Sequence, residues 1–502
     1  MIRVARILSA VAAITRLFSV ALLLPILIAF AYEPWDASIF GVPAPGTALD
    51  FLAAFAACCA FWVPASIATR RVKDDDLLDR EAYLTMAVGW LVVTAFAMLP
   101  FLLSGTIARP IDAFFEAMSG LTGTGSSALS PDANPAASVI WWRAFTQWLG
   151  GLGIIILTVA LLSKLTHGGL QLFRGEAGAS TASRIKPKVA EVARGLWRMY
   201  GIITILFVAA LALLIHFRLG VAGKESLFQG MVGSFAAYGN GAFASPGMLA
   251  SLQDGWVQAL VALMMVAGAT NFTLAFLLVR RAQARPILSN PEWRFFAVWT
   301  LVAISVTSLV LAWHGWRPGE ALHQGAFTTI SLSTGAGLGA GHAGWPAAGV
   351  LVLLVLVLVG GTAGSAAGGI KAFRAFVLLR LVGREMRQML HPRAILPLRV
   401  GARVVPEGAV SAVIAFFFTY LGLWLLGAFL LLLFQPGLDL IGATGTALAA
   451  LGNVGGWFGD PASLGTAAFS PASKLVLVLL MWMGRLEIFA ALLVFTPRSW
   501  RN

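Results

Sequence analysis

Charged residues are scarce in this chain of 502 residues. Lys, Arg, Asp and Glu make up 11% of it, whereas 59% is hydrophobic and the mean hydropathy is +0.85. Soluble proteins contain roughly 25% charged residues. This composition excludes an ordinary soluble domain, and we interpret the chain as an all-α protein that crosses a membrane many times.

Cysteine and histidine are rare as well, with 2 and 6 residues respectively. Cys58 and Cys59 are adjacent within one apolar stretch, so they are too close to form a disulfide with each other. The sequence shows no Cys and His spacing typical of a metal site, no nucleophile–base pair, no phosphate-binding loop and no paired carboxylates. These absences argue against a disulfide, a resident metal and an enzyme.

Acidic residues are fewer than basic residues. The chain has 22 Asp and Glu and 35 Lys and Arg, which gives a net charge of +13. The basic residues lie in short segments between apolar stretches, so they indicate membrane topology and not nucleic-acid binding. The segment between the first two apolar stretches contains Glu33 and Asp36 but no Lys or Arg, whereas both of its flanks are basic. We therefore expect this segment outside the cell and both termini in the cytoplasm.

The apolar stretches predict ten full spans and, between them, four amphipathic half-spans that are too short to cross a membrane. The expected spans are residues 7–31, 49–69, 81–103, 136–162, 197–217, 258–279, 295–313, 347–374, 409–434 and 473–495. The expected half-spans are residues 111–121, 224–237, 319–332 and 438–450. A unit of span, half-span and returning span thus recurs in residues 73–165, 166–282, 283–386 and 387–502, after a leading helix pair in residues 1–72.

Each half-span leads into a Gly-rich polar turn. The last glycines of the four turns are Gly125, Gly241, Gly337 and Gly455, separated by 116, 96 and 118 residues. In potassium-selective pores, four equivalent loops supply backbone carbonyls that replace the hydration shell of the ion. Glycine suits such loops because some of these carbonyls require a positive φ. The repetition therefore predicts a pore with pseudo-fourfold symmetry.

The eighth span is interrupted by five glycines within the ten residues 360–369. Each glycine inside a helix costs roughly 1 kcal/mol relative to alanine. In lipid, such a break survives only where it is buried in protein or lines a wet cavity. Gly360 lies fourteen residues beyond Pro346, a rise of roughly 21 Å, so the break is well inside the bilayer. We interpret it as a gate; the alternative is a helix end followed by a flexible loop.

Arg485 lies at a similar depth, fourteen residues or roughly 21 Å beyond Pro471. An arginine there costs at least roughly 2.5 kcal/mol on insertion scales, so it should face a wet interior or a partner. We expect it to limit ion flow. The alternatives are an ion pair with Glu487 or an extended side chain that reaches the cytoplasm.

Three further polar residues in apolar surroundings have competing interpretations. We expect Lys371 to cap the inner end of the break and not to bind permeating cations, because its positive charge would repel them. Glu116 either raises the local cation concentration or hydrogen-bonds a neighbouring loop. Asn271 is more often a helix–helix hydrogen-bonding residue than a pore ligand.

Three motifs of this sequence resemble Trk-type potassium-uptake proteins of the Trk/Ktr/HKT superfamily. They are WRAFTQWLGGLGII at 142–155, GGTAGSAAGGIK at 360–371, and MGRLEIF at 483–489 with TPRSWR at 496–501. The resemblance covers nearly the whole chain. It implies a homodimer in the bacterial cytoplasmic (inner) membrane, with a narrow filter above a gate. It also implies a separate TrkA-like cytoplasmic subunit that binds NAD or ATP, and no cofactor on this chain.

Carried over by position, the resemblance implies a K⁺ filter and a gate. The implied filter residues are Thr122, Gly123, Thr124, Gly125, Tyr238, Gly239, Asn240, Gly241, Thr334, Gly335, Ala336, Gly337, Leu451, Gly452, Asn453, Val454 and Gly455. The implied gate residues are Gly360, Gly361, Thr362, Ala363, Gly364, Ser365, Gly368, Gly369, Lys371 and Arg485. The turns depart from the family pattern, because hydroxylated residues are fewer here. Whether Gly335 or Gly337 ends the third filter stays open.

The leading hypothesis is potassium uptake through this filter, gated under control of the cytoplasmic partner. A less selective Na⁺/K⁺ channel and a cation-coupled secondary carrier are alternatives, and coupling to protons or sodium stays open. Four half-spans of the same sense favour a pore over a carrier, whose repeats are usually inverted or twofold. A non-conducting scaffold would leave the recurring turns and the buried arginine unexplained.

Overall fold

The computed structural model describes residues 4–39, 42–70, 79–130, 133–164, 189–281, 283–339, 344–401, 403–455 and 465–497. The regular secondary structure of these residues is helical, apart from two short antiparallel hairpins. One hairpin pairs β1 (Ala37–Ile39) with β2 (Val42–Ala44), and the other pairs β3 (Arg399–Val400) with β4 (Arg403–Val404). The prediction of a mainly helical membrane protein is confirmed.

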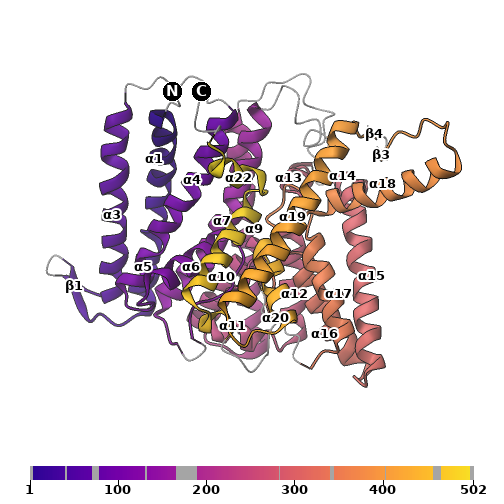
Figure 1. Cartoon of the computed structure of the whole chain (residues 1–502). Coiled ribbons are helices and arrows are strands. Elements are labelled where there is room, and N and C mark those ends of the chain that lie inside the picture. Colours follow the sequence, from indigo (N-terminus) through magenta and orange to yellow (C-terminus); the bar gives the residue numbers. More distant parts are fainter. Residues whose placement is uncertain are drawn as a thin grey trace.

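The leading pair consists of α1 (Val4–Ala21) with α2 (Leu24–Tyr32), and of α3 (Gly46–Thr69). Pro25 lies at the start of α2, where its missing N–H is not needed by the helix. The first expected span is therefore two successive helices. In Figure 1, α1, α3 and α4 stand side by side at one edge of the molecule, with the β1–β2 hairpin at the end away from the marked termini.

Four groups of helices follow, which we call units 1 to 4. Unit 1 contains α4 (Asp79–Ala97), α5 (Leu99–Leu103), α6 (Pro110–Thr122) and α7 (Ala137–Lys164). Unit 2 contains α9 (Val189–Leu219), α10 (Gly223–Gly239), α11 (Pro246–Ser251), α12 (Gly255–Gly268) and α13 (Phe272–Arg281), and leads into α14 (Arg285–Leu288). Unit 3 contains α15 (Pro291–Trp313), α16 (Pro318–Ser333), α17 (Ala347–Val359) and α18 (Ala372–Leu390). Unit 4 contains α19 (Glu407–Phe434), α20 (Leu440–Leu451), the 3₁₀ turn η1 (Gly465–Ala468), α21 (Pro471–Arg485) and α22 (Phe489–Phe495).

Six segments of the described chain are long and apolar enough to cross a membrane, or seven if the bent pair α12–α13 counts as one span. The six are Val4–Tyr32, Gly46–Thr69, Arg80–Leu103, Ala193–Leu219, Pro291–Trp313 and Glu407–Phe434. α7, α17 and α21 occupy the places of the other expected spans. The count of ten stays a prediction.

The four short helices α6, α10, α16 and α20 lie within two residues of the expected half-spans at each end. In Figure 1 they all lie in the half of the molecule away from the marked termini. Each packs against the returning helix of the preceding unit: α6 on α21, α10 on α7, α16 on α12, and α20 on α17. These contacts close a ring of four units.

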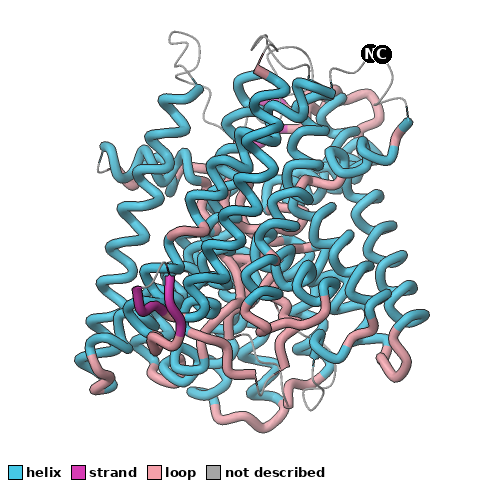
Figure 2. Tube along the Cα trace, turned by 90° about the vertical axis from the view of Figure 1, so that its left-hand side faces the viewer, coloured by secondary structure: helices cyan, strands magenta, loops and turns pink. Residues whose placement is uncertain are grey.

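Three returning helices are broken near the centre of the molecule, where Figure 2 shows loops running between the helices. α12 and α13 differ in direction by 107°, so residues 258–279 form two helices with a sharp bend, and the expected span there stays a prediction. The expected span over residues 473–495 is likewise interrupted, because α21 and α22 are separated at Glu487 and Ile488, which have φ of 57° and 59°. The third break, between α17 and α18, is the expected Gly-rich stretch.

Candidate ion pathway

The four turns that follow the short helices share a left-handed residue at the same place. In each, a left-handed residue comes just after the helix, and its N–H donates to the carbonyl three residues earlier. These residues and their N···O distances are Gly123 (2.9 Å), Asn240 (3.3 Å), Gly335 (3.1 Å) and Asn453 (3.2 Å). After Asn240, Gly335 and Asn453, the N–H of the next residue donates to the carbonyl five residues earlier. The four turns therefore have a common register, although only Gly125 and Gly337 have a positive φ at the last position.

This shared conformation defines the register of the turns. Turn 1 is residues 122–125, turn 2 is 239–242, turn 3 is 334–337 and turn 4 is 452–455. Turn 2 thus lies one residue later than the expected 238–241, and its last position is Ala242 instead of glycine. In turn 3, Gly337 occupies the place of Gly125, and both have a positive φ.

The last residues of the turns meet closely. A Cβ on Gly125 would lie 2.5 Å from the backbone nitrogen of Ala242. A Cβ on Gly455 would lie 2.7 Å from the carbonyl oxygen of Thr124 and 3.2 Å from that of Ala336. A Cβ on Gly337 would collide with the carbonyl of Gly455. The four turns therefore converge at one place, where backbone carbonyl oxygens are close and a side chain on Gly125, Gly337 or Gly455 would have no room.

The returning helices support the turns through glycine. A Cβ on Gly150 would clash with the carbonyl of Leu121 at the end of α6. In the same way, a Cβ on Gly268 would clash with the carbonyl of Tyr238 in α10, and a Cβ on Gly484 with that of Leu451 in α20. In unit 4 the amide of Asn453 also donates to the carbonyl of Met481 on α21, at 2.8 Å. Close packing against the backbone of α7, α12 and α21 thus supports turns 1, 2 and 4.

The Gly-rich loop of residues 360–371 is packed beneath turns 3 and 4. A Cβ on Gly335 would lie 3.3 Å from the backbone nitrogen of Gly368, and a Cβ on Gly368 would meet the carbonyl of Gly452. Thr362, Ala363, Ser365, Ala366 and Ala367 are all buried. The alternative of a helix end followed by a loose loop does not fit this packing.

The loop is hydrogen-bonded to the break between α12 and α13. The bonds run from Thr362 N and Oγ1 to Ala269 O (3.1 and 2.7 Å), Ala366 N to Gly268 O (3.0 Å), Phe272 N to Gly364 O (3.0 Å) and Asn271 Nδ2 to Ala363 O (2.7 Å). The Asn271 Oδ1 atom also accepts from Thr273 N and Leu274 N, which caps the start of α13. Asn271 therefore joins helix to loop, a variant of the expected helix–helix bond.

Arg485 reaches the loop from the last residue of α21. Its Nη1 donates to the carbonyl of Ala366 at 2.8 Å and would lie 3.6 Å from a Cβ on Gly123. The side chain is 3% exposed, and Nε and Nη2 have no hydrogen-bond partner among the described residues. The guanidinium therefore lies between turn 1 and the loop.

The alternative ion pair of Arg485 with Glu487 is not formed. Glu487 instead binds Lys371 Nζ at 2.9 Å and Arg374 Nη2 at 2.6 Å. Lys371 is the residue at which the loop ends and α18 begins. The positive charge of Lys371 is thus paired with the carboxylate of Glu487 at the end of the loop.

Glu116 does not face the turns. It is fully buried and accepts hydrogen bonds from Arg143 and from the segment after turn 1. Of its two interpretations, the structure favours the hydrogen bond to a neighbouring loop. Within the described residues, no group of three or more His, Cys, Asp or Glu could hold a metal ion. Backbone carbonyl oxygens, in contrast, lie close together where the four turns converge.

The chain matches the TrkH family model, described as "Cation transport protein", over residues 49–502. It is 32% identical to the Trk system potassium uptake protein TrkH of Salmonella typhimurium over 493 residues, which is 97% of each chain. It is 33% identical to the protein of the same name from Vibrio parahaemolyticus over 494 residues, again 97% of each chain. The crystal structure of the potassium transporter TrkH from Vibrio parahaemolyticus superimposes with a TM-score of 0.85 at 29% identity, covering 100% of both chains. These relatives are named as transporters and not as enzymes, and this chain belongs to the TrkH family of cation transport proteins.

Proposed function

We propose that this chain takes up potassium across the bacterial cytoplasmic membrane through a filter formed by its four turns. The observation that supports this most directly is the convergence of turns 1 to 4, with backbone carbonyls close together at Gly455. Four equivalent loops of this kind can replace the hydration shell of K⁺ with carbonyl oxygens. In this proposal the chain divides into the leading pair of residues 1–72 and four pore units within residues 73–502.

The second part of the proposal is a gate directly below the filter. The loop of residues 360–371 contributes a movable backbone segment, and Arg485 contributes a fixed positive charge. A guanidinium opposes a passing cation by about 4 kcal/mol at roughly 4 Å and an effective dielectric constant near 20. Loop and arginine touch through Ala366, so they act on the same ions in series.

The third part concerns regulation. We propose that a TrkA-like cytoplasmic subunit, which binds NAD or ATP, docks on the basic inner surface of a homodimer. The exposed side chains of Arg280 and Arg285 lie at the end of α13 and at the start of α14. α13 begins where the loop is hydrogen-bonded, so a partner bound here could act on the gate. Both termini are cytoplasmic in this arrangement.

A less selective Na⁺/K⁺ conductance is the second candidate. Ala242 favours it, because one of the four equivalent last positions carries a methyl group and the fourfold symmetry is broken there. A cation-coupled carrier would require the broken helices to move as repeats, and coupling would then appear in transport measurements.

The test is potassium-dependent growth of an uptake-deficient bacterium that expresses this chain, followed by tracer rubidium uptake into proteoliposomes. We expect growth at low potassium and rubidium uptake that potassium inhibits more strongly than sodium. Equal inhibition by both ions would support the less selective conductance. Uptake that collapses when the proton or sodium gradient is removed would support a carrier. Absence of any cation uptake by folded protein would refute the proposal.

A further inference from the structure

We propose that Glu116 and Arg143 are positioning residues that set ion selectivity, because they brace the segment leaving turn 1. This inference rests on the proposed function, since it requires that turn 1 is part of the filter. It concerns the segment that follows Gly125, the last residue of turn 1.

The two residues form a buried ion pair between α6 and α7. Glu116 Oε1 accepts from Arg143 Nε at 2.6 Å, and the side chains are 0% and 11% exposed. A buried pair of this kind seldom adds net stability, because desolvation offsets the attraction. Loss of one partner, however, leaves an uncompensated buried charge. A role in positioning therefore explains the pair better than stability does.

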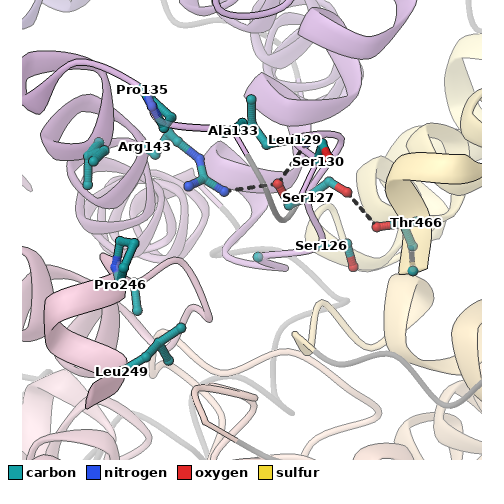
Figure 3. Close-up of a pocket in the computed structure, with 14 residues that line it drawn as sticks. Ser126, Ser127, Leu129, Ser130, Ala133, Pro135, Arg143, Pro246, Leu249 and Thr466 are labelled. Carbon is teal, nitrogen blue, oxygen red and sulfur yellow. Dashed lines mark hydrogen bonds between the residues drawn. The ribbon is translucent and has the colours of Figure 1, made fainter. Parts of the chain in front are cut away.

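The pair holds the chain just beyond Gly125. The carboxylate of Glu116 accepts from the backbone N–H of Ala128 at 2.6 Å and from the hydroxyl of Ser127 at 3.2 Å. Arg143 Nη2 donates to the same hydroxyl at 3.0 Å, as Figure 3 shows. Both members of the ion pair thus converge on Ser127, two residues after the last position of turn 1.

Ser127 is also held from the opposite side. The hydroxyl of Thr466, in η1 of unit 4, donates to the Ser127 carbonyl at 2.7 Å. Gly125, Ser127, Arg143 and Thr466 line a cavity of about 390 Å³ beside the end of turn 1. The segment therefore lines this cavity and is hydrogen-bonded both to Arg143 and to Thr466.

Arg143 contacts turn 2 as well. Its guanidinium carbon lies 4.3 Å from the ring centroid of Phe243, the residue after Ala242. Such a cation–π contact contributes a favourable interaction when it is partly desolvated. A single side chain therefore braces the ends of two adjacent turns.

Glu116 has no counterpart in the other units. It lies six residues before the first position of turn 1, and the corresponding residues are Gly233, Thr328 and Thr446. The brace is therefore specific to turn 1. If the carbonyls there are no longer held, they can relax around a smaller ion, and discrimination between potassium and sodium should fall.

The experiment measures tracer rubidium and tracer sodium uptake by the purified full chain in proteoliposomes. The variants are Glu116→Gln, Arg143→Lys and Ser127→Ala, and the matched control is Glu81→Gln. Glu81 is also a buried carboxylate near an arginine, Arg6, but it lies thirteen residues, roughly 20 Å, before Thr94, which contacts Met118 on α6. Folding is checked by size-exclusion profile and thermal unfolding.

We expect the rubidium-to-sodium uptake ratio to fall by roughly tenfold in Glu116→Gln and Arg143→Lys, equivalent to about 1.4 kcal/mol. The control should keep the parent ratio. The double variant should lose less than the product of the single effects, because both residues act on one segment. Ser127→Ala keeps the ion pair and removes only the hydroxyl, so it decides the question if the other variants do not fold.

Folded variants that keep the parent ratio would overturn the positioning role while leaving the proposed function intact. An equal fall of the ratio in Glu81→Gln would also overturn it, because general loss of stability would then be the cause. A parent chain that transports no rubidium would overturn the proposed function itself.

Discussion

The guanidinium of Arg485 is hydrogen-bonded to the carbonyl of Ala366 at 2.8 Å. This bond joins the end of α21 in unit 4 to the Gly-rich loop of unit 3. Two groups that could each restrict an ion path are therefore in direct contact. Their contact leads to the first two predictions.

Truncation of Arg485 to alanine should raise cation flux several-fold and reduce its dependence on the cytoplasmic partner. The physical reason is the loss of a fixed positive charge that opposes a cation by about 4 kcal/mol at roughly 4 Å. The measurement is tracer rubidium uptake into proteoliposomes. Arg218→Ala is the control, because Arg218 is half exposed and pairs with Asp254 at the surface. A well-folded Arg485→Ala protein that is slower than the parent would contradict the prediction.

Deletion of residues 362–367 should also raise rubidium flux, because it removes the segment that packs beneath the turns. The same deletion removes the loop's hydrogen bonds to Gly268, Ala269, Asn271 and Phe272, so folding must be confirmed first. Combined with Arg485→Ala, the deletion should add less than the sum of the two separate effects. Full additivity would show that loop and arginine do not act on one barrier.

Gly125→Ser and Gly455→Ser should both lower rubidium uptake and the rubidium-to-sodium ratio, for different reasons. Gly125 has a φ of 78°, which costs roughly 1–2 kcal/mol for a residue with a Cβ, and its Cβ would crowd Ala242. Gly455 has no positive φ, but its Cβ would meet the Ala242 methyl. Gly437→Ser is the matched control, because φ is 81° there and nothing lies within 4 Å. Unchanged ratios in both turn variants would refute the filter assignment.

Charge reversal of Arg280 and Arg285 to glutamate should weaken capture of a nucleotide-binding partner from detergent extracts. Exposed charges act over roughly 8–10 Å at physiological ionic strength, so the loss should be largest at low salt. The binding is measured by pull-down over a range of salt concentrations. Arg218→Glu serves as a control on another surface. Capture that responds neither to the reversal nor to salt would place the docking site elsewhere.

The short helices could be predicted from the sequence because each is too short to cross a membrane and leads into a Gly-rich polar turn. The break between α12 and α13 could not, because Ala269, Thr270 and Asn271 interrupt the apolar run without a cluster of glycines or a proline. Its cause is tertiary: the carbonyls of Gly268 and Ala269 accept bonds from a loop about ninety residues later in the chain.

The register of the turns could also not be fully predicted from the sequence. Glycine marked the expected register, but in turn 2 the left-handed residue is Asn240 with a φ of 52°. Asparagine tolerates this conformation better than most residues, so the pattern of glycines is displaced by one position. The ion pair of Glu487 with Lys371 could not be predicted from the sequence either. It forms because α21 ends at Arg485 and Glu487, with its positive φ, directs its carboxylate toward Lys371.

The interlocked breaks have a mechanical consequence. α13 is tied to the loop through Phe272 and Asn271, and its other end carries the exposed Arg280. A ten-residue helix is roughly 15 Å long, so α13 forms a short lever between the exposed Arg280 and the loop. A tilt of this lever must either drag Ala363 and Gly364 with it or break their hydrogen bonds. Force applied at the Arg280 end of α13 is therefore delivered to the loop through these hydrogen bonds.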